Sequence, residues 1–138
     1  MLSVFLACDD PYETARLFIS ELGWEHVFAT SPDSDDRLAC VRLADAEIML
    51  GTADEQFLPA ASRAHRGAGV TVYITVRAED DITAIHDRHR AAGVVTGPLS
   101  DRPWGQRAFD AVIGGYRFLI AVDRAPRILL PCSPACRL

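Results

Sequence analysis

Hydrophobic and polar positions follow the same order in two stretches of the chain. Each stretch opens with apolar residues at every second position, continues with apolar residues three or four apart, and closes with three further short apolar runs. The opening runs start at Leu2 and Val70, so an offset of 68 residues superimposes the two stretches. This order predicts a strand, an amphipathic helix and three strands in each stretch. Solenoid repeats are shorter and more numerous, so two long copies indicate one domain of two similar modules.

The first module is expected over about residues 2–51 and the second over about 69–123, joined by a linker at 52–68 with one short helical turn. Predicted strands in the first module are Leu2–Cys8, Glu25–Thr30, Leu38–Leu43 and Glu47–Gly51. Those in the second are Gly69–Val76, Val94–Gly97, Gln106–Val112 and Tyr116–Asp123. Each helical stretch ends at a glycine, Gly23 or Gly93, because glycine readily takes the left-handed conformation that follows helix C-termini.

Alternation along the strands assigns each side chain to one of two sheet faces. The face turned toward the helices is expected to hold Val70, Val72, Ile74, Val76, Phe118, Ile120 and Val122. The opposite face is expected to hold Thr71, Tyr73, Thr75, Arg117, Leu119 and Ala121. In the first module, Leu2, Val4, Leu6 and Cys8 share one face, and Ser3, Phe5 and Ala7 share the other.

Length and charge narrow the function classes. The chain has 138 residues, 49% of them hydrophobic, so we expect one compact domain over residues 1–123 followed by a tail at 124–138. Its 19 acidic and 14 basic residues give a net charge of −5 without a basic stripe, which disfavours nucleic acid and favours neutral or cationic small molecules. No apolar run approaches the roughly 20 residues that span a bilayer, and no signal-peptide pattern opens the chain. We therefore expect a cytoplasmic protein with no membrane association.

The four cysteines fall into two kinds. Cys8 and Cys40 lie in strand patterns and are expected to be small buried side chains rather than partners in a disulfide. Cys132 and Cys136 lie in the Pro-containing tail, where a flexible segment is favoured over redox chemistry or metal binding.

Several strings resemble the vicinal oxygen chelate superfamily, and within it the glyoxalase and bleomycin-resistance branch. The second module contributes Gly69-Val-Thr-Val-Tyr-Ile-Thr-Val, Ala91-Ala-Gly-Val, Asp101-Arg-Pro-Trp-Gly-Gln-Arg-Ala-Phe and Gly115-Tyr-Arg-Phe. The first contributes Glu13-Thr-Ala-Arg-Leu-Phe and Glu21-Leu-Gly-Trp. The resemblance implies an α+β fold of two βαβββ modules that form a curved, eight-stranded mixed-sheet cup with helices outside. It also implies a homodimer.

The resemblance further implies where a metal ion would be held. Metal-dependent relatives place His or Glu on the inward face of the first and last strands of each module. Carried onto this chain, the four places fall at about Ser3, Met49, Thr71 and Leu119. Hydroxyl, thioether and apolar side chains are poor ligands for a divalent ion, so we predict no bound metal and no other cofactor. Glu47, on the face of Met49, remains as one possible carboxylate, and His86 and His89 are interpreted as solvated or partly packed.

The inward face of the cup is expected to bind a small molecule. The candidate ligand-binding residues are Phe5, Phe28, Met49, Thr71, Tyr73, Trp104, Arg117 and Leu119, with Thr75 and Trp24 as further candidates. Aromatic walls with a few hydroxyl groups and charges suit a flat or amphipathic ligand. For Trp104, in a loop between Pro103 and Gly105, lid packing or a dimer contact is as good an interpretation as ligand contact.

No catalytic motif accompanies these residues: the sequence has no nucleophile elbow, phosphate-binding glycine loop or dinucleotide fingerprint. We therefore expect a metal-free, non-enzymatic, homodimeric protein of the bleomycin-resistance type that binds an antibiotic-like molecule. A cationic ligand is favoured by Asp33, Asp35, Asp36 and Glu47. The alternatives are a metal-dependent lyase, isomerase or ring-cleaving dioxygenase, and a regulatory or scaffold domain whose cup is filled by its own side chains.

Overall fold

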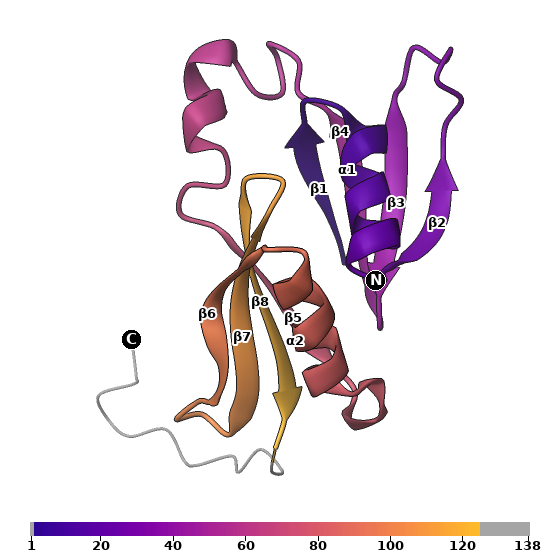
Figure 1. Ribbon diagram of the computed structural model, residues 1–138. Helices are drawn as coiled ribbons and strands as arrows, with labels where there is room; N and C mark the ends of the chain where they lie inside the picture. The colour runs from indigo at the N-terminus through magenta and orange to yellow at the C-terminus, as the bar shows by residue number, and fades with distance from the viewer. Residues whose placement is uncertain (1, 125–138) are drawn as a thin grey trace.

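The computed structural model describes residues 2–124, which form two modules of the expected order (Figure 1). The first contains β1 (Ser3–Cys8), α1 (Pro11–Arg16), the π-helical turn η1 (Leu17–Glu21), β2 (Glu25–Ala29), β3 (Leu38–Leu43) and β4 (Ala46–Thr52). The linker holds the 3-10 helix η2 (Ala60–His65), which confirms the expected helical turn. The second module contains β5 (Thr71–Val76), η3 (Ala78–Asp80), α2 (Ile82–Ala91), β6 (Val95–Asp101), β7 (Gln106–Ile113) and β8 (Tyr116–Asp123).

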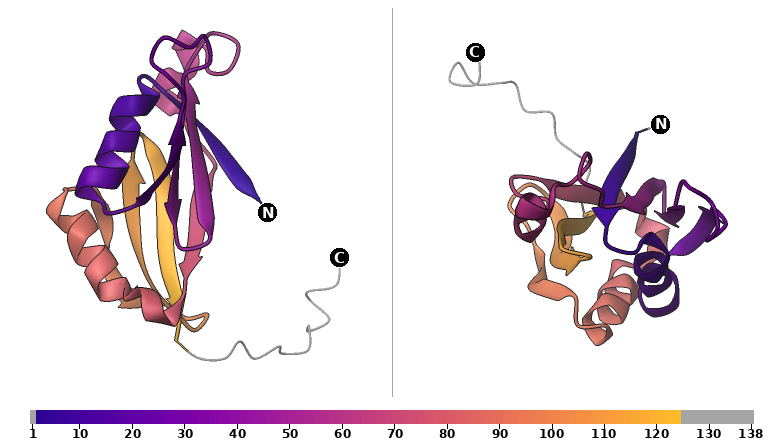
Figure 2. Two further views of the ribbon diagram at one scale, coloured as in Figure 1. Left: turned by 90° about the vertical axis from the view of Figure 1, so that its right-hand side faces the viewer. Right: turned by 90° about the horizontal axis from the view of Figure 1, so that it is seen from above.

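Each module forms its own four-stranded mixed sheet, with the strand orders β1-β4-β3-β2 and β5-β8-β7-β6. The first strand of each module pairs in parallel with the last, and the other pairs are antiparallel. Both α-helices lie on the same side of the two sheets (Figure 2). The opposite side, called the cup face below, has no α-helix over it. The α+β fold of two βαβββ modules is confirmed, with its eight strands in two sheets rather than a closed barrel.

The register of the strands preserves the repeat seen in the sequence. Ser3 of β1 pairs with Glu47 of β4, and the equivalent pair in the second module is Thr71 with Arg117. The first strands of the two modules are thus 68 residues apart, as predicted, whereas the last strands are 70 residues apart. Equivalent positions therefore lie on equivalent faces of both sheets.

The predicted faces are confirmed along most of each strand. Side chains buried against the helices are Leu6, Cys8, Val72, Ile74, Val76, Phe118, Ile120 and Val122. Leu2 and Val70 were also expected there, but they are 86% and 58% exposed. The reason is that β1 and β5 begin one residue later, at Ser3 and Thr71, so the alternation starts outside the sheet.

Local signals set the bounds of α1. Asp10 is its N-cap and accepts hydrogen bonds from the backbone N–H groups of Tyr12 and Glu13, at 3.0 and 3.4 Å. The helix widens into the π-turn η1 and ends at Gly23, whose φ of +80° confirms the expected left-handed cap. Arg88 of α2 donates to the carbonyls of Glu21 and Ser20, so the second module satisfies the end of this helix. Within residues 2–124, no helix has the length and apolar character needed to cross a bilayer.

One hydrophobic core extends through both modules. The ring of Phe118 from β8 packs edge-on against Phe18 and Trp24 of the first module, with centroids 6.0 and 6.1 Å apart. Trp24, a candidate for the cup, is only 2% exposed and lies in this core, so that expectation was wrong. Its position directly after the capping glycine turns it toward the helix side. Phe109, also fully buried, completes the core.

Two polar contacts join the modules inside this core. The Tyr116 hydroxyl donates to the Ala7 carbonyl at 2.8 Å and accepts from the Ala7 N–H at 3.1 Å. The Trp24 indole donates to Nε2 of His89 at 3.1 Å. Nδ1 of His89 lies 2.7 Å from the Ile85 carbonyl and therefore carries the proton. His89 is fully buried, which corrects the interpretation of this histidine as solvated or only partly packed.

The strand β6 is longer than expected. It continues to Asp101, whereas the sequence predicted a loop from Pro98 to Gly105. Proline is tolerated because β6 is the edge strand of its sheet, and the register with β7 is irregular between Gly97 and Ser100. The remaining turn still carries Trp104, as predicted.

Candidate functional site

Three of the predicted ligand-binding residues form one row across the first sheet. Phe5 of β1 pairs with Met49 of β4, Met49 pairs with Cys40 of β3, and Cys40 pairs with Phe28 of β2. This row lies on the cup face, since its strand neighbours Leu6, Ile48, Val41 and Ala39 are buried in the core. Phe5 is 46% exposed and Phe28 is also exposed, so the row presents aromatic surface toward the cup.

Phe5 also lines a pocket at one end of this row. Its ring lies over Gly51, where a Cβ atom would collide with it, and meets Phe57 of the linker edge-on at 5.1 Å. The pocket has a volume of about 370 Å³. Its remaining lining residues are Asp35, Asp36, Arg37, Leu38, Thr52 and Asp54. We call it the aromatic–acidic pocket.

Charge and hydrogen bonding in the aromatic–acidic pocket favour a positively charged ligand. Three carboxylates face one guanidinium, that of Arg37, which lies over the Tyr12 ring at 4.9 Å and 3.5 Å from Asp10. Asp54 accepts a hydrogen bond from the Phe57 N–H at 2.7 Å and so holds the backbone of Phe57 beside the pocket. The Thr52 hydroxyl is buried and makes no hydrogen bond within residues 2–124.

A hydrogen-bonded cluster occupies the cup face of the second module. Tyr73 donates to Oε1 of Gln106, and Trp104 donates to the same oxygen at 2.8 Å and to the Tyr73 hydroxyl at 3.0 Å. Nε2 of Gln106 donates to Asp123 at 2.9 Å and to Thr75 at 3.4 Å. Two predicted residues, Tyr73 and Trp104, are thus brought together by Gln106, which sequence reasoning missed. The sequence could have indicated it, because Gln106 begins a predicted strand and lies on the same face of that strand as Ala108 and Asp110.

The other predicted residues of this module also lie on the cup face. Thr71 pairs with Arg117, and Tyr73 pairs with Leu119. Asp110, opposite Leu119, forms an ion pair with Arg102 at 2.8 Å that the sequence did not indicate. The predicted residues therefore form two groups, one on each sheet.

The four places implied for metal ligands do not fit a divalent ion. Ser3, Met49, Thr71 and Leu119 all lie on the cup face, but they offer two hydroxyls, a thioether and an apolar side chain. Glu47 is half-buried and its carboxylate is held by Arg42, so it is committed to an ion pair. Across residues 2–124, no three His, Cys, Asp or Glu side chains gather as a metal site.

The cysteines of the described region are not nucleophiles. Cys8 and Cys40 are buried free thiols, as predicted. Burial raises the pKa of Cys8 to about 11 and also raises the pKa of Cys40, so both stay protonated at neutral pH. Cys132 and Cys136 lie outside the described residues.

Comparison with known proteins rests on structure. No protein-family model matches the chain. No curated protein matches it either. TioX from Micromonospora sp. ML1 is similar with a TM-score of 0.66 and 19% identity, over 93% of this chain and 99% of that one.

Two further solved structures have similar folds. FosX, a fosfomycin resistance protein from Listeria monocytogenes in complex with Mn(II) and 1S,2S-dihydroxypropylphosphonic acid, has a TM-score of 0.66 and 15% identity, over 94% of this chain and 95% of that one. A glyoxalase/bleomycin resistance protein/dioxygenase superfamily member from Sphaerobacter thermophilus DSM 20745 has a TM-score of 0.61 and 24% identity, over 88% and 94%. With its paired βαβββ modules, this chain shares the fold of these solved structures, among them the glyoxalase/bleomycin resistance protein/dioxygenase superfamily member.

Proposed function

We propose that this protein binds a cationic, aromatic, antibiotic-like small molecule on its cup face without a metal ion. The observation that carries the proposal is the aromatic–acidic pocket, in which Phe5 and Phe57 stand beside Asp35, Asp36 and Asp54. A cation over an aromatic face gains about 0.5–2 kcal/mol, with the larger value reached as water is excluded. Neighbouring carboxylates add attraction and raise the rate of encounter.

The second module supplies a different surface to the same face. Trp104 is 55% exposed although its indole N–H is already bonded, so its ring is the part left for stacking. Tyr73 beside it is held in place by Gln106. A flat ligand that contacts both sheets would use Phe5 on one side and the Tyr73–Trp104 pair on the other, with Thr71, Arg117, Met49, Leu119 and Phe28 around it.

A cytoplasmic homodimer is part of the proposal. The large exposed side chains on the cup face include Phe5, Phe28, Tyr73, Trp104 and Val112. Exposed apolar area of this kind is typical of ligand grooves and of subunit contacts. The half-exposed rings also speak against the scaffold alternative, which requires a cup filled by its own side chains.

The enzyme alternative has one observation in its favour, namely that the FosX structure contains Mn(II). In this chain, the side chains at Ser3, Met49, Thr71 and Leu119 oppose it, because they leave a divalent ion without His or carboxylate ligands. A binding protein needs no such group. The resistance named for FosX motivates antibiotics as the first ligands to examine.

The test is a matched pair of ligands. We expect N-methylquinolinium, an aromatic cation, to bind and quinoline-2-carboxylate, an anion of similar shape, to bind far more weakly. At about 100 times the dissociation constant, the cation should raise the free energy of unfolding by about 2.7 kcal/mol, which is several degrees in melting temperature. A glycopeptide antibiotic such as bleomycin is assayed beside them.

Variants locate the binding. Phe57→Ala and Asp36→Asn should weaken binding of the cation, whereas Asp33→Asn, in the same loop but outside the pocket, should leave it unchanged. If neither the cation nor a broad antibiotic panel shifts the melting temperature, the proposed function is wrong.

A further inference from the structure

A second cavity lies on the side of the molecule opposite the cup face, between α2 and the strands β6 and β7. It has a volume of about 550 Å³, within the range of small-molecule sites. Its lining consists of His86 and Arg90 from α2, Val95, Pro98 and Leu99 from β6, and Arg107 from β7. We infer that this outer groove binds an amphipathic organic anion, a carboxylate or phosphate ester with an apolar body.

The basic groups come from two elements and flank the groove. Arg90 is exposed in the last turn of α2, and no ion pair within residues 2–124 engages it. Arg107 lies on the opposite wall, half-buried, with Nη1 3.3 Å from Asp101. Guanidinium groups present paired donors that match the oxygens of a carboxylate or phosphate, so two of them can hold one anionic head.

The floor between these arginines is apolar. Val95 and Leu99 are partly buried and pack against the hydrophobic core. The His86 ring stands edge-on to Phe109 at 5.2 Å, with Nδ1 3.1 Å from Asp87. A ligand with an alkyl or aryl body would cover this floor, which a bare inorganic anion would leave in water.

Acidic neighbours reduce the positive charge of the groove but do not cancel it. Asp101 lies 3.3 Å from Arg107 and 3.8 Å from Arg124, and Asp87 lies beside His86. The lining arginines Arg90 and Arg107, together with Arg124 next to Asp101, therefore outnumber these two carboxylates. In a chain with a net charge of −5, this local excess of positive charge is opposite in sign to the whole.

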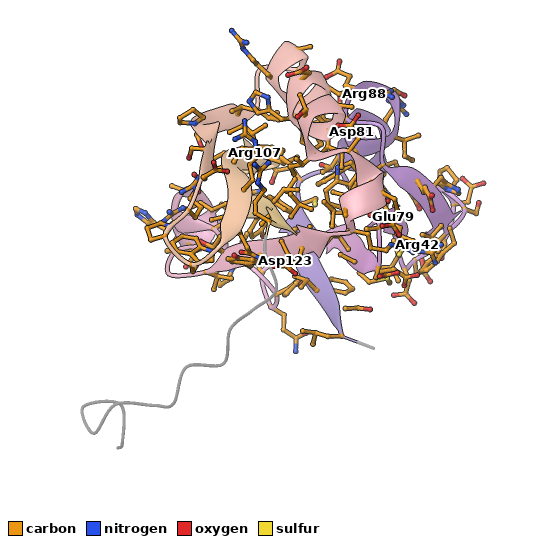
Figure 3. All side chains as sticks on the ribbon, turned by 90° about the horizontal axis from the view of Figure 1, so that it is seen from below. Arg42, Glu79, Asp81, Arg88, Arg107 and Asp123 are labelled. Carbon is orange, nitrogen blue, oxygen red and sulfur yellow. The ribbon has the colours of Figure 1, made fainter. Side chains whose placement is uncertain are left out.

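The outer groove is separate from the cup. Arg107 points toward α2, whereas Asp123, which pairs in register with the preceding residue Gln106, lies on the other side of the sheet (Figure 3). Binding in the groove therefore does not use the residues proposed for the cup ligand, and either proposal can fail without the other.

The experiment is titration of the full chain at low ionic strength with octanoate and octyl phosphate, followed by calorimetry and by amide chemical shifts. We expect saturable binding of at least one of them. Arg90→Gln and Arg107→Gln should each weaken it by about tenfold, since each removes a charged hydrogen-bond donor. Arg16→Gln is the matched control, because Arg16 occupies the last turn of α1 as Arg90 occupies that of α2.

Four results would overturn the inference. They are no saturable binding of either anion, equal weakening by Arg16→Gln, equal binding of octyltrimethylammonium, and inorganic phosphate binding as tightly as octyl phosphate. Among the described residues Arg90 has no ion-pair partner, so Arg90→Gln still tests the inference if Arg107→Gln is destabilised.

Discussion

The indole of Trp24 donates a hydrogen bond to the buried imidazole of His89, across a sequence distance of 65 residues and between the two modules. Burial lowers the pKa of His89, because the charged imidazolium is poorly solvated in the core. The neutral ring uses one nitrogen to accept from Trp24 and the other to donate to Ile85. Protonation would put a donor opposite the indole N–H and break this contact.

The first prediction follows from that pKa. A lowered pKa means that the unfolded chain binds a proton more readily than the folded protein, so the contribution of His89 to stability is fully present above about pH 6.5. It is lost as pH falls from there toward the lower pKa of the folded state. His89→Gln should cost about 1–3 kcal/mol at pH 7.5 by leaving the Trp24 donor poorly paired.

Urea unfolding at pH 7.5, 6.0 and 5.0 checks this prediction. The difference in unfolding free energy between the natural chain and His89→Gln should shrink as the pH falls. His65→Gln, an exposed histidine of the linker, should show no such narrowing. Equal narrowing in both variants would contradict the assigned role.

The second prediction concerns Gly51. Its missing side chain makes room for the Phe5 ring, so Gly51→Ala should push this half-exposed ring from its rotamer, cost about 0.5–1.5 kcal/mol and weaken binding of N-methylquinolinium. The double variant Phe5→Ala with Gly51→Ala should recover stability relative to the sum of the single changes but not recover binding. Thermal unfolding and ligand titration of the four proteins measure both effects, and strictly additive stabilities would refute the contact.

A third prediction concerns Gln106. Gln106→Leu keeps the approximate side-chain volume but removes the acceptor shared by Tyr73 and Trp104, so we expect a loss of about 1–3 kcal/mol. Trp104 fluorescence should also shift, because its indole N–H loses its partners. Gln56→Leu, a glutamine outside the cluster, serves as the control. Unchanged fluorescence in Gln106→Leu would show that the cluster does not form.

A fourth prediction concerns metal content. Protein purified without chelators should contain far less than one equivalent of iron, zinc, nickel or manganese per chain by elemental analysis, since Ser3, Met49, Thr71 and Leu119 are poor ligands. Treatment with EDTA should leave both the melting temperature and binding of the aromatic cation unchanged. Near-stoichiometric metal that resists dialysis would favour the enzyme alternative.

Periodicity predicted the features that depend on neighbours in sequence. The two-residue alternation placed Phe5, Met49, Tyr73 and Leu119 on one face, and the 68-residue offset held for the first strands. It failed at Leu2 and Val70, because an alternating pattern does not mark where hydrogen bonding to the next strand begins.

Several contacts that sequence reasoning missed join distant segments. Phe57 and Asp54 lie in a linker without a period, and only folding brings them to Phe5. Trp24 has an aromatic side chain of the kind that lines ligand pockets, but its position directly after Gly23 places it in the core. A single chain carries no signal for pairs such as Trp24 with His89, since neither residue constrains the other locally.

The Tyr116 hydroxyl has a consequence for association as well as for folding. β1 is an edge strand, and an uncovered edge offers its N–H and C=O groups to a strand of another chain. Tyr116 takes both groups of Ala7, so one phenol covers the C-terminal end of this edge strand with a contact from the other module. At this position, the atom that links the two modules also takes the backbone groups that a strand of another chain would need.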